Sequence, residues 1–209
     1  YGLVGSEMCI RDRANNELVQ QAKAEGEHAL GYTCYFVPET LLNLPGCFSS
    51  RLRAPHTGSI DVGTYYMSSK ICSYTRSILE RGIEGGYNFL SGLMGTETCS
   101  EMNRALEHFE LLQLVDNEQF FVTFLDMPFK VTENTVRHYV DQLRRKVLTP
   151  LQEVYGVDVS DDALRKAVAE HNEVCRILTE IGQFRKEENP RITGYELSLI
   201  HISEPTRPY

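Results

Sequence analysis

The sequence feature that most constrains the fold is the apolar stretch QFFVTFLDM at residues 119–127. Apolar and aromatic side chains occupy neighbouring positions there, so both faces of an extended strand need to be buried. Parallel strands meet this requirement, because their crossover connections place helices on both faces of the sheet. This one segment therefore predicts an α/β architecture.

Strand and helix patterns alternate along the rest of the chain, which supports the same fold class. Further strands are expected at residues 29–37, 47–53 and 87–94. Helices are expected at residues 38–44, 61–67, 73–86, 98–114, 133–155 and 161–186. Ser73 and Thr98 are the predicted N-caps of two of these helices. The overall expectation is a layered parallel sheet of the Rossmann or flavodoxin-like type, followed by a long helical excursion.

The two ends of the chain differ from the rest. DNA encoding residues 3–12 can be written so that its reverse complement, read one base out of step, encodes residues 198–207. This complementarity resembles a transposon-end sequencing adapter translated in frame. We therefore expect residues 1–13 and 198–209 to be adapter-derived, and we exclude them from the fold argument.

The remaining residues are expected to form three segments of a longer protein. Residues 14–130 are predicted to be an N-terminal α/β domain, and residues 131–190 a helical segment. Residues 191–197 would begin a second α/β domain that is cut short. On this interpretation the chain is the N-terminal half of its protein.

Charge and composition exclude several functional classes. With 29 acidic and 21 basic residues, the chain has a formal net charge of −8. An acidic chain is a poor ligand for nucleic acid or for an anionic membrane. No run approaches the roughly 20 apolar residues that a membrane-spanning helix needs. The expected partners therefore include neither nucleic acid nor membrane.

The cysteines favour a reducing compartment. Excluding Cys9 as adapter-derived leaves an odd, widely spaced set that does not resemble a disulfide framework, and it favours the cytoplasm. These five residues are Cys34, Cys47, Cys72, Cys99 and Cys175. Cys34 and Cys175 are expected in the core, and Cys47 in a turn with no evident partner.

Cys72 and Cys99 are the exceptions, because each comes just before a helical pattern. The partial positive charge and free N–H groups of a helix N-terminus stabilise a thiolate and an anionic metal site. Cys99 also follows a predicted strand, at the sheet edge where α/β proteins bind ligands, so the two cysteines can converge there. The alternative is that both are small buried hydrophobic residues.

Six segments occur in an order that resembles the 2-hydroxyacyl-CoA dehydratase family, which also includes benzoyl-CoA reductase subunits. The similarity covers nearly all of residues 14–196. The segments are GYTCYFVPETLLNLPG (31–46), KICSYTRSIL (70–79), TETC (96–99), FLDMPF (124–129), residues 151–178 and ITGYE (192–196).

This resemblance implies an iron-sulfur subunit. Family members bind a [4Fe-4S] cluster through three cysteines, of which Cys72 and Cys99 match the first two. The third would lie in the missing C-terminal half. The implied partners are a sister dehydratase subunit, an ATP-dependent iron-sulfur activator protein and an acyl-CoA substrate. One-electron activation would allow a 2-hydroxyacyl-CoA to lose water through a ketyl radical.

Glu39, which follows the first predicted strand, is the candidate catalytic residue. It could orient the substrate or move a proton, although a glutamate in the first turn of a helix is favoured by the helix dipole in any case. Asp126 is expected to shape the loop after its strand.

Three other functions stay open at this point. The chain could belong to a benzoyl-CoA-reductase-type enzyme, it could be a noncatalytic electron-transfer module, or it could be a partner subunit that supplies only an interface.

Overall fold

A four-stranded parallel sheet forms the centre of the computed structural model, which describes residues 17–54, 57 and 59–196. Its order is β2-β1-β3-β4, and all three pairings are parallel. The strands are β1 (His28–Tyr32), β2 (Cys47–Arg51), β3 (Leu90–Thr96) and β4 (Phe121–Leu125). The α/β fold class predicted from the apolar stretch is confirmed. The two terminal regions predicted to be adapter-derived, residues 1–13 and 198–209, lie outside the described residues.

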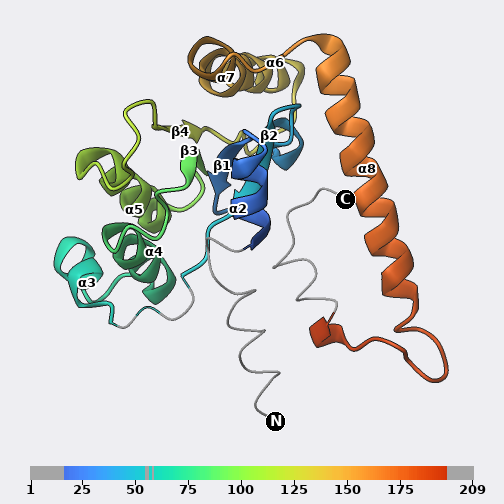
Figure 1. The fold of residues 1–209 in the computed structure, drawn as a ribbon, viewed down its shortest axis with the longest axis horizontal. Coiled ribbons are helices and arrows are strands. Elements are labelled where there is room, and N and C mark those ends of the chain that lie inside the picture. Colours follow the sequence, from blue (N-terminus) through green and yellow to red (C-terminus); the bar gives the residue numbers. More distant parts are fainter. Residues whose placement is uncertain (1–16, 55–56, 58, 197–209) are drawn as a thin grey trace.

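Helices cover both faces of this sheet (Figure 1). The first group consists of α2 (Glu17–Ala24), α3 (Asp61–Met67), α4 (Ser73–Ile83) and α5 (Ser100–Leu111). The second group consists of the 3-10 helix η1 (Glu39–Leu42), α6 (Glu133–Leu143), the π-helical η2 (Arg144–Leu148), α7 (Thr149–Tyr155) and α8 (Asp161–Gln183).

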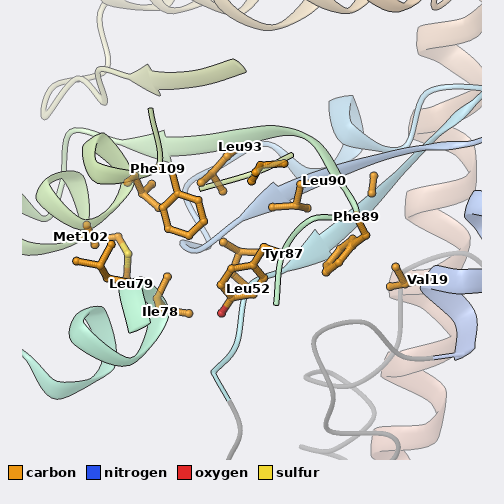
Figure 2. Close-up of a cluster of buried hydrophobic side chains, with 14 of the residues drawn as sticks. Val19, Leu52, Ile78, Leu79, Tyr87, Phe89, Leu90, Leu93, Met102 and Phe109 are labelled. Carbon is orange, nitrogen blue, oxygen red and sulfur yellow. The ribbon is translucent and has the colours of Figure 1, made fainter. Parts of the chain in front are cut away.

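The alternation of side chains along the strands divides the core into two clusters. On β1, Ala29 belongs to the cluster under α4 and α5, whereas Leu30 belongs to the cluster under α7 and α8. Figure 2 shows the first cluster, in which the rings of Tyr87 and Phe109 lie 5.8 Å apart near Leu93. A sheet buried on both faces explains why its strands are apolar throughout.

All four strands are shorter than predicted, and hydrogen-bonded turns replace the ends of two of them. The strand expected at 29–37 ends at Tyr32, after which the Val37 N–H donates to the Cys34 carbonyl in a turn. The strand expected at 87–94 begins only at Leu90, whose N–H donates to the Tyr87 carbonyl. The apolar stretch at 119–127 does form β4, as the end strand of the sheet described here.

The long helix expected at 133–155 is continuous but contains one π-helical turn, η2. Val147 and Leu151 on this stretch are buried against the sheet, whereas Val136 and Val140 remain 49% and 41% exposed. The buried contact of this continuous helix with the sheet is therefore centred on Val147 and Leu151. Helix α8 then extends away from the body, with only Ala163 and Ala167 buried along its length (Figure 1).

The strand order defines where a ligand can bind. The connection from β1 leads to β2 on one side, and β3 and β4 lie on the other side. The crevice between diverging connections, outside the carboxyl ends of the strands, is where open α/β sheets bind ligands. The connections that follow β1, β2 and β3 contain Glu39, Cys72 and Cys99 respectively.

Candidate functional site

Cys72 and Cys99 occupy equivalent positions, each as the residue that immediately precedes a helix. Cys72 is the N-cap of α4 and Cys99 is the N-cap of α5. The predictions of Ser73 and Thr98 as N-caps are therefore wrong. Ser73 is the first residue of α4, and the Thr98 hydroxyl instead shares a 2.8 Å hydrogen bond with the Thr96 hydroxyl.

Both cysteines are exposed to solvent. Each is a free cysteine, and neither side chain caps its helix. The alternative of small buried hydrophobic residues therefore does not describe them. A sulfur atom beside the N-terminal N–H groups of a helix experiences the field that favours its thiolate form.

One hydrogen bond joins the starts of the two helices. The Cys72 backbone N–H donates to Glu101 Oε2 at 3.1 Å, and Glu101 lies in the first turn of α5, two residues after Cys99. The fold thus places the two cysteine N-caps at neighbouring helix ends, although 29 residues separate the bonded partners. Sequence spacing alone could not establish this contact.

The donor set suits part of an iron-sulfur site. Two thiols are the soft ligands that iron-sulfur clusters take, and adjacent helix N-termini favour the negative charge of such a cluster. No group of three or more His, Cys, Asp or Glu side chains arranged for a metal ion occurs in the part of the chain that the structure describes. Cys72 and Cys99 could therefore offer two sulfur atoms to such a site, and the residues described here form no complete ligand set.

Tyr74 connects this region to the ends of the first two strands. Its hydroxyl donates to the Leu52 carbonyl at 2.8 Å, just beyond β2. Burial raises the pKa of Tyr74, the charges of Arg51 and Arg53 lower it, and negative charge at Cys72 and at Cys34 raises it. The Tyr74 side chain thus ties the start of α4 to the chain just beyond β2.

Cys34 differs from its predicted position. It lies in the turn after β1 and is half-buried, whereas the sequence pattern placed it in a strand of the core. It lies two residues beyond the strand end, where the chain turns.

Glu39 is held by two hydroxyl groups from the sheet. Its Oε1 accepts hydrogen bonds from the Tyr32 hydroxyl and from the Ser49 Oγ, both at 2.9 Å. Asn43 supports this arrangement, because its side-chain amide donates to Ser49 Oγ at 3.1 Å and to the Glu39 carbonyl at 3.2 Å. The carboxylate thus has a fixed orientation beside β1 and β2.

The protonation of Tyr32 reflects this contact. Burial, the negative charge of Glu39 and the hydrogen bond to Glu39 raise the pKa of Tyr32 well above its ordinary value, and Arg51 opposes this rise. Tyr32 therefore stays a neutral donor to the carboxylate. The sequence indicated Glu39 as a candidate residue. It did not indicate Tyr32 and Ser49, because both lie within strands whose apolar pattern indicated only core packing.

Asp126 follows β4 and is held through its backbone. Gln142 is buried and clamps its backbone, since the Asp126 N–H donates to Gln142 Oε1 at 3.0 Å and Gln142 Nε2 donates to the Asp126 carbonyl at 3.2 Å. Lys146, in the π-helical turn, donates to the Phe124 carbonyl at 2.6 Å. Polar side chains of α6 and η2 thus fix the carboxyl end of β4.

The two remaining cysteines lie outside this region. Cys47 is buried as the first residue of β2, not in a turn. Cys175 is exposed on α8, where its sulfur lies 3.6 Å from His171 Nε2, so its predicted core position is wrong. Helix α8 stands clear of the sheet at this point, and its apolar spacing therefore does not lead to burial.

No helix in the described ranges combines the length and apolar character needed to cross a membrane.

Comparison with known proteins assigns the chain to one family, and the curated proteins similar to it agree with that assignment. The profile of the family described as 2-hydroxyglutaryl-CoA dehydratase, D-component, matches residues 34–204. The (R)-phenyllactyl-CoA dehydratase beta subunit of Clostridium sporogenes is 23% identical over 191 residues, which cover 91% of this chain and 50% of that protein.

Two further curated relatives match over similar regions. A benzoyl-CoA reductase subunit of Thauera aromatica is 19% identical over 82% of this chain and 44% of its own length. The beta subunit of (R)-2-hydroxyglutaryl-CoA dehydratase from Acidaminococcus fermentans is 22% identical over 78% of this chain and 44% of its own length. The chain thus spans about half the length of the curated relatives that it matches.

Proposed function

Because the chain belongs to the 2-hydroxyglutaryl-CoA dehydratase D-component family, we propose that it acts in an iron-sulfur subunit of a 2-hydroxyacyl-CoA dehydratase. The reaction would be the elimination of water from a 2-hydroxyacyl-CoA after ATP-driven one-electron activation. This makes the complete enzyme a lyase that works in the reducing cytoplasm.

The observation that carries the proposal is the pair of exposed cysteines at adjoining helix starts. Cys72 and Cys99 precede α4 and α5, and the bond from the Cys72 N–H to Glu101 holds these ends together. A purely structural pair of cysteines would have little reason to be exposed and to leave both helices without a side-chain cap.

Cys72 and Cys99 would hold two irons of a [4Fe-4S] cluster, with a third cysteine supplied from outside the described residues. When bound, the cluster would supply a low-potential electron and a Lewis-acidic iron. The positive ends of α4 and α5 would stabilise the thiolates of these two cysteines.

Glu39 would hold or move a proton at its carboxylate. Tyr32 and Ser49 fix Oε1, so the carboxylate cannot swing freely toward solvent. General acid or base groups need this kind of fixed placement near the reacting atoms. The structural alternative is that the same bonds merely fasten η1 to the sheet.

The partners follow from the same proposal. All three relatives are named as subunits, two of them as beta subunits, which supports assembly with a sister subunit. An ATP-dependent iron-sulfur activator would deliver the electron, and an acyl-CoA would be the substrate.

The match to a benzoyl-CoA reductase subunit supports a second candidate. A reductase would use the same cysteines but would add electrons to an aromatic acyl-CoA instead of removing water. A noncatalytic electron-transfer or partner subunit would bind a cluster or an interface without turnover.

The test is anaerobic turnover of the full-length chain assembled with its sister subunit and activator. A dehydratase would form the 2,3-unsaturated thioester from phenyllactyl-CoA or 2-hydroxyglutaryl-CoA only in the presence of activator and ATP. Reduction of benzoyl-CoA without dehydration would favour the reductase. Cluster reduction with no turnover of any of these thioesters would favour the noncatalytic module.

A further inference from the structure

The peptide group that leads into Cys72 is held at both ends by charged side chains. Arg76 Nε donates to the Ile71 carbonyl at 3.1 Å, and the Cys72 N–H donates to Glu101 Oε2 at 3.1 Å. The carbonyl and the N–H belong to the same peptide bond. A helix offers no backbone partner of its own to its N-cap N–H or to the carbonyl before it, so both groups need partners from elsewhere. A cation of α4 and a carboxylate of α5 supply them here.

The Arg76 end of this clamp is itself anchored on α3. Arg76 Nη1 donates to Thr64 Oγ1 at 2.8 Å, and that hydroxyl donates to the Ile60 carbonyl at 2.6 Å. Arg76 is half-buried, and its backbone carbonyl packs closely against Gly63. The guanidinium is therefore held from two sides while it binds the Ile71 carbonyl.

The carbonyl of Cys72 is bonded as well. It accepts from Thr75 Oγ1 at 2.8 Å and from the Arg76 N–H at 3.3 Å. With both backbone polar groups of Cys72 engaged, rotation about its Cα–Cβ bond is the main freedom that remains to the sulfur. The clamp thus fixes the point from which the thiol projects.

Glu101 is the part of the clamp that relates Cys72 to Cys99. It is half-buried in the first turn of α5, two residues after Cys99, and it reaches across 29 residues of sequence to the Cys72 N–H. Hydrogen bonds to an ionised group are stronger than those between neutral groups. Without this bond, α4 and α5 would still pack through the apolar cluster that contains Leu79 and Met102, but the chain before Cys72 could shift.

We propose that Glu101 and Arg76 are positioning residues that hold the Cys72 sulfur within reach of the Cys99 sulfur. This rests on the proposed function, in which both cysteines bind one cluster, and it assigns the residues that gather these two ligands before iron arrives. Ligands that are already gathered lose less conformational freedom on binding than ligands that must be collected.

The test measures the proximity of the two sulfurs with no cluster present. The full-length chain is stripped of iron with a chelator under anaerobic conditions and treated with dibromobimane, which bridges two thiols and fluoresces when both have reacted. Mass spectrometry of the peptides identifies the bridge between Cys72 and Cys99. We expect Glu101→Ala to slow bridging relative to single alkylation by about 3- to 10-fold, since one hydrogen bond to a charged group is lost.

The conservative variant separates position from charge. Glu101→Gln keeps an acceptor oxygen for the Cys72 N–H and should bridge at close to the wild-type rate. Arg76→Ala should slow bridging as Glu101→Ala does. Glu107→Ala is the matched control, because it removes another carboxylate of α5, one paired with Arg104 on the surface, and should leave bridging unchanged.

Thermal unfolding of each variant separates loss of folding from loss of position, and the two Glu101 variants decide the question if Arg76→Ala unfolds. The inference is overturned if the wild-type chain forms no bridge, or if Glu101→Ala bridges at the wild-type rate. If bridging depends on Glu101 but the wild-type chain takes up no cluster on anaerobic reconstitution, the positioning role stands and the proposed function fails.

Discussion

At the scale of single residues, the site depends on neutral groups that orient charged ones. The Glu39 carboxylate accepts from the hydroxyls of Tyr32 and Ser49, neither of which can neutralise it by donating a full proton at ordinary pH. Such donors fix the position of a carboxylate while leaving its charge available. Side-chain substitutions can therefore separate the orientation of Glu39 from its charge.

Replacing Glu39 by glutamine tests the charge alone. The amide would keep an oxygen that accepts from Tyr32 and Ser49, so the fold should persist, whereas proton transfer would be lost. We expect Glu39→Gln to lower dehydration by about 10²–10⁴-fold in the full assembly, with little change in melting temperature. Glu153→Gln, on the exposed surface of α7, is the control. Unchanged turnover in Glu39→Gln would assign this residue to structure only.

Tyr32 makes a prediction about alkaline stability. Its folded-state pKa lies above the ordinary value of 10.0, because burial and the charge of Glu39 disfavour the phenolate. The stabilisation is therefore complete below about pH 10 and is lost as pH rises further, by at most about 1.4 kcal/mol per pH unit. Tyr32→Phe should make the alkaline fall in unfolding free energy shallower.

Denaturant titrations between pH 8 and pH 11, a range of about three units around the ordinary tyrosine value, would measure this slope. Tyr35→Phe, at a side chain that is 93% exposed, is the control and should leave the slope unchanged. An equal slope in Tyr32→Phe and the wild type would contradict the assignment of the raised pKa to Tyr32.

At the scale of elements, the position of the Cys72 helix depends on a close contact between α3 and α4. A Cβ atom at Gly63 would lie 2.4 Å from the Arg76 carbonyl oxygen, so only glycine fits here without backbone movement. The Gly63 N–H also donates to Glu80 Oε2 at 2.6 Å, and Glu80 is only 5% exposed. The two helices are thus joined by backbone proximity and by one buried carboxylate.

Gly63→Ala should separate these helices. We expect a loss of about 1–3 kcal/mol in unfolding free energy, because the added methyl group meets backbone and not a flexible side chain. Val62→Ala, one position earlier on an exposed face of α3, should cost less. Equal stability of Gly63→Ala and the wild type would mean that α3 and α4 can move apart freely.

At the scale of the whole molecule, the fold brings two distant helix starts together, and under the proposed function these would supply only part of a cluster site. Cys72 and Cys99 are the two proposed sulfur ligands, and the described residues contain no group of three or more candidate ligands. An iron-sulfur cluster bound by two thiolates is under-ligated. Cluster binding should therefore depend on ligands from outside this region.

Anaerobic reconstitution of the 209-residue chain with iron and sulfide checks this dependence. We expect iron binding well below that of a complete cluster, and a further loss in Cys72→Ser and Cys99→Ser. Cys175→Ser, at an exposed thiol on α8, is the control and should retain the wild-type iron content. A stable four-iron signal from this chain alone would refute the expectation.

The sequence by itself determined the fold class, the presence of most helices and the placement of both cysteines before helices. These properties depend on local patterns, since an apolar strand needs two-sided cover and helical periodicity marks a helix. Only the tertiary structure decided the strand order and the Cys72–Glu101 contact. The tertiary structure also determined that the hydroxyl groups of Tyr32 and Ser49 donate to the Glu39 carboxylate. Periodicity encodes which face is buried but not which distant element covers it, so contacts between segments far apart in the chain emerge only on folding.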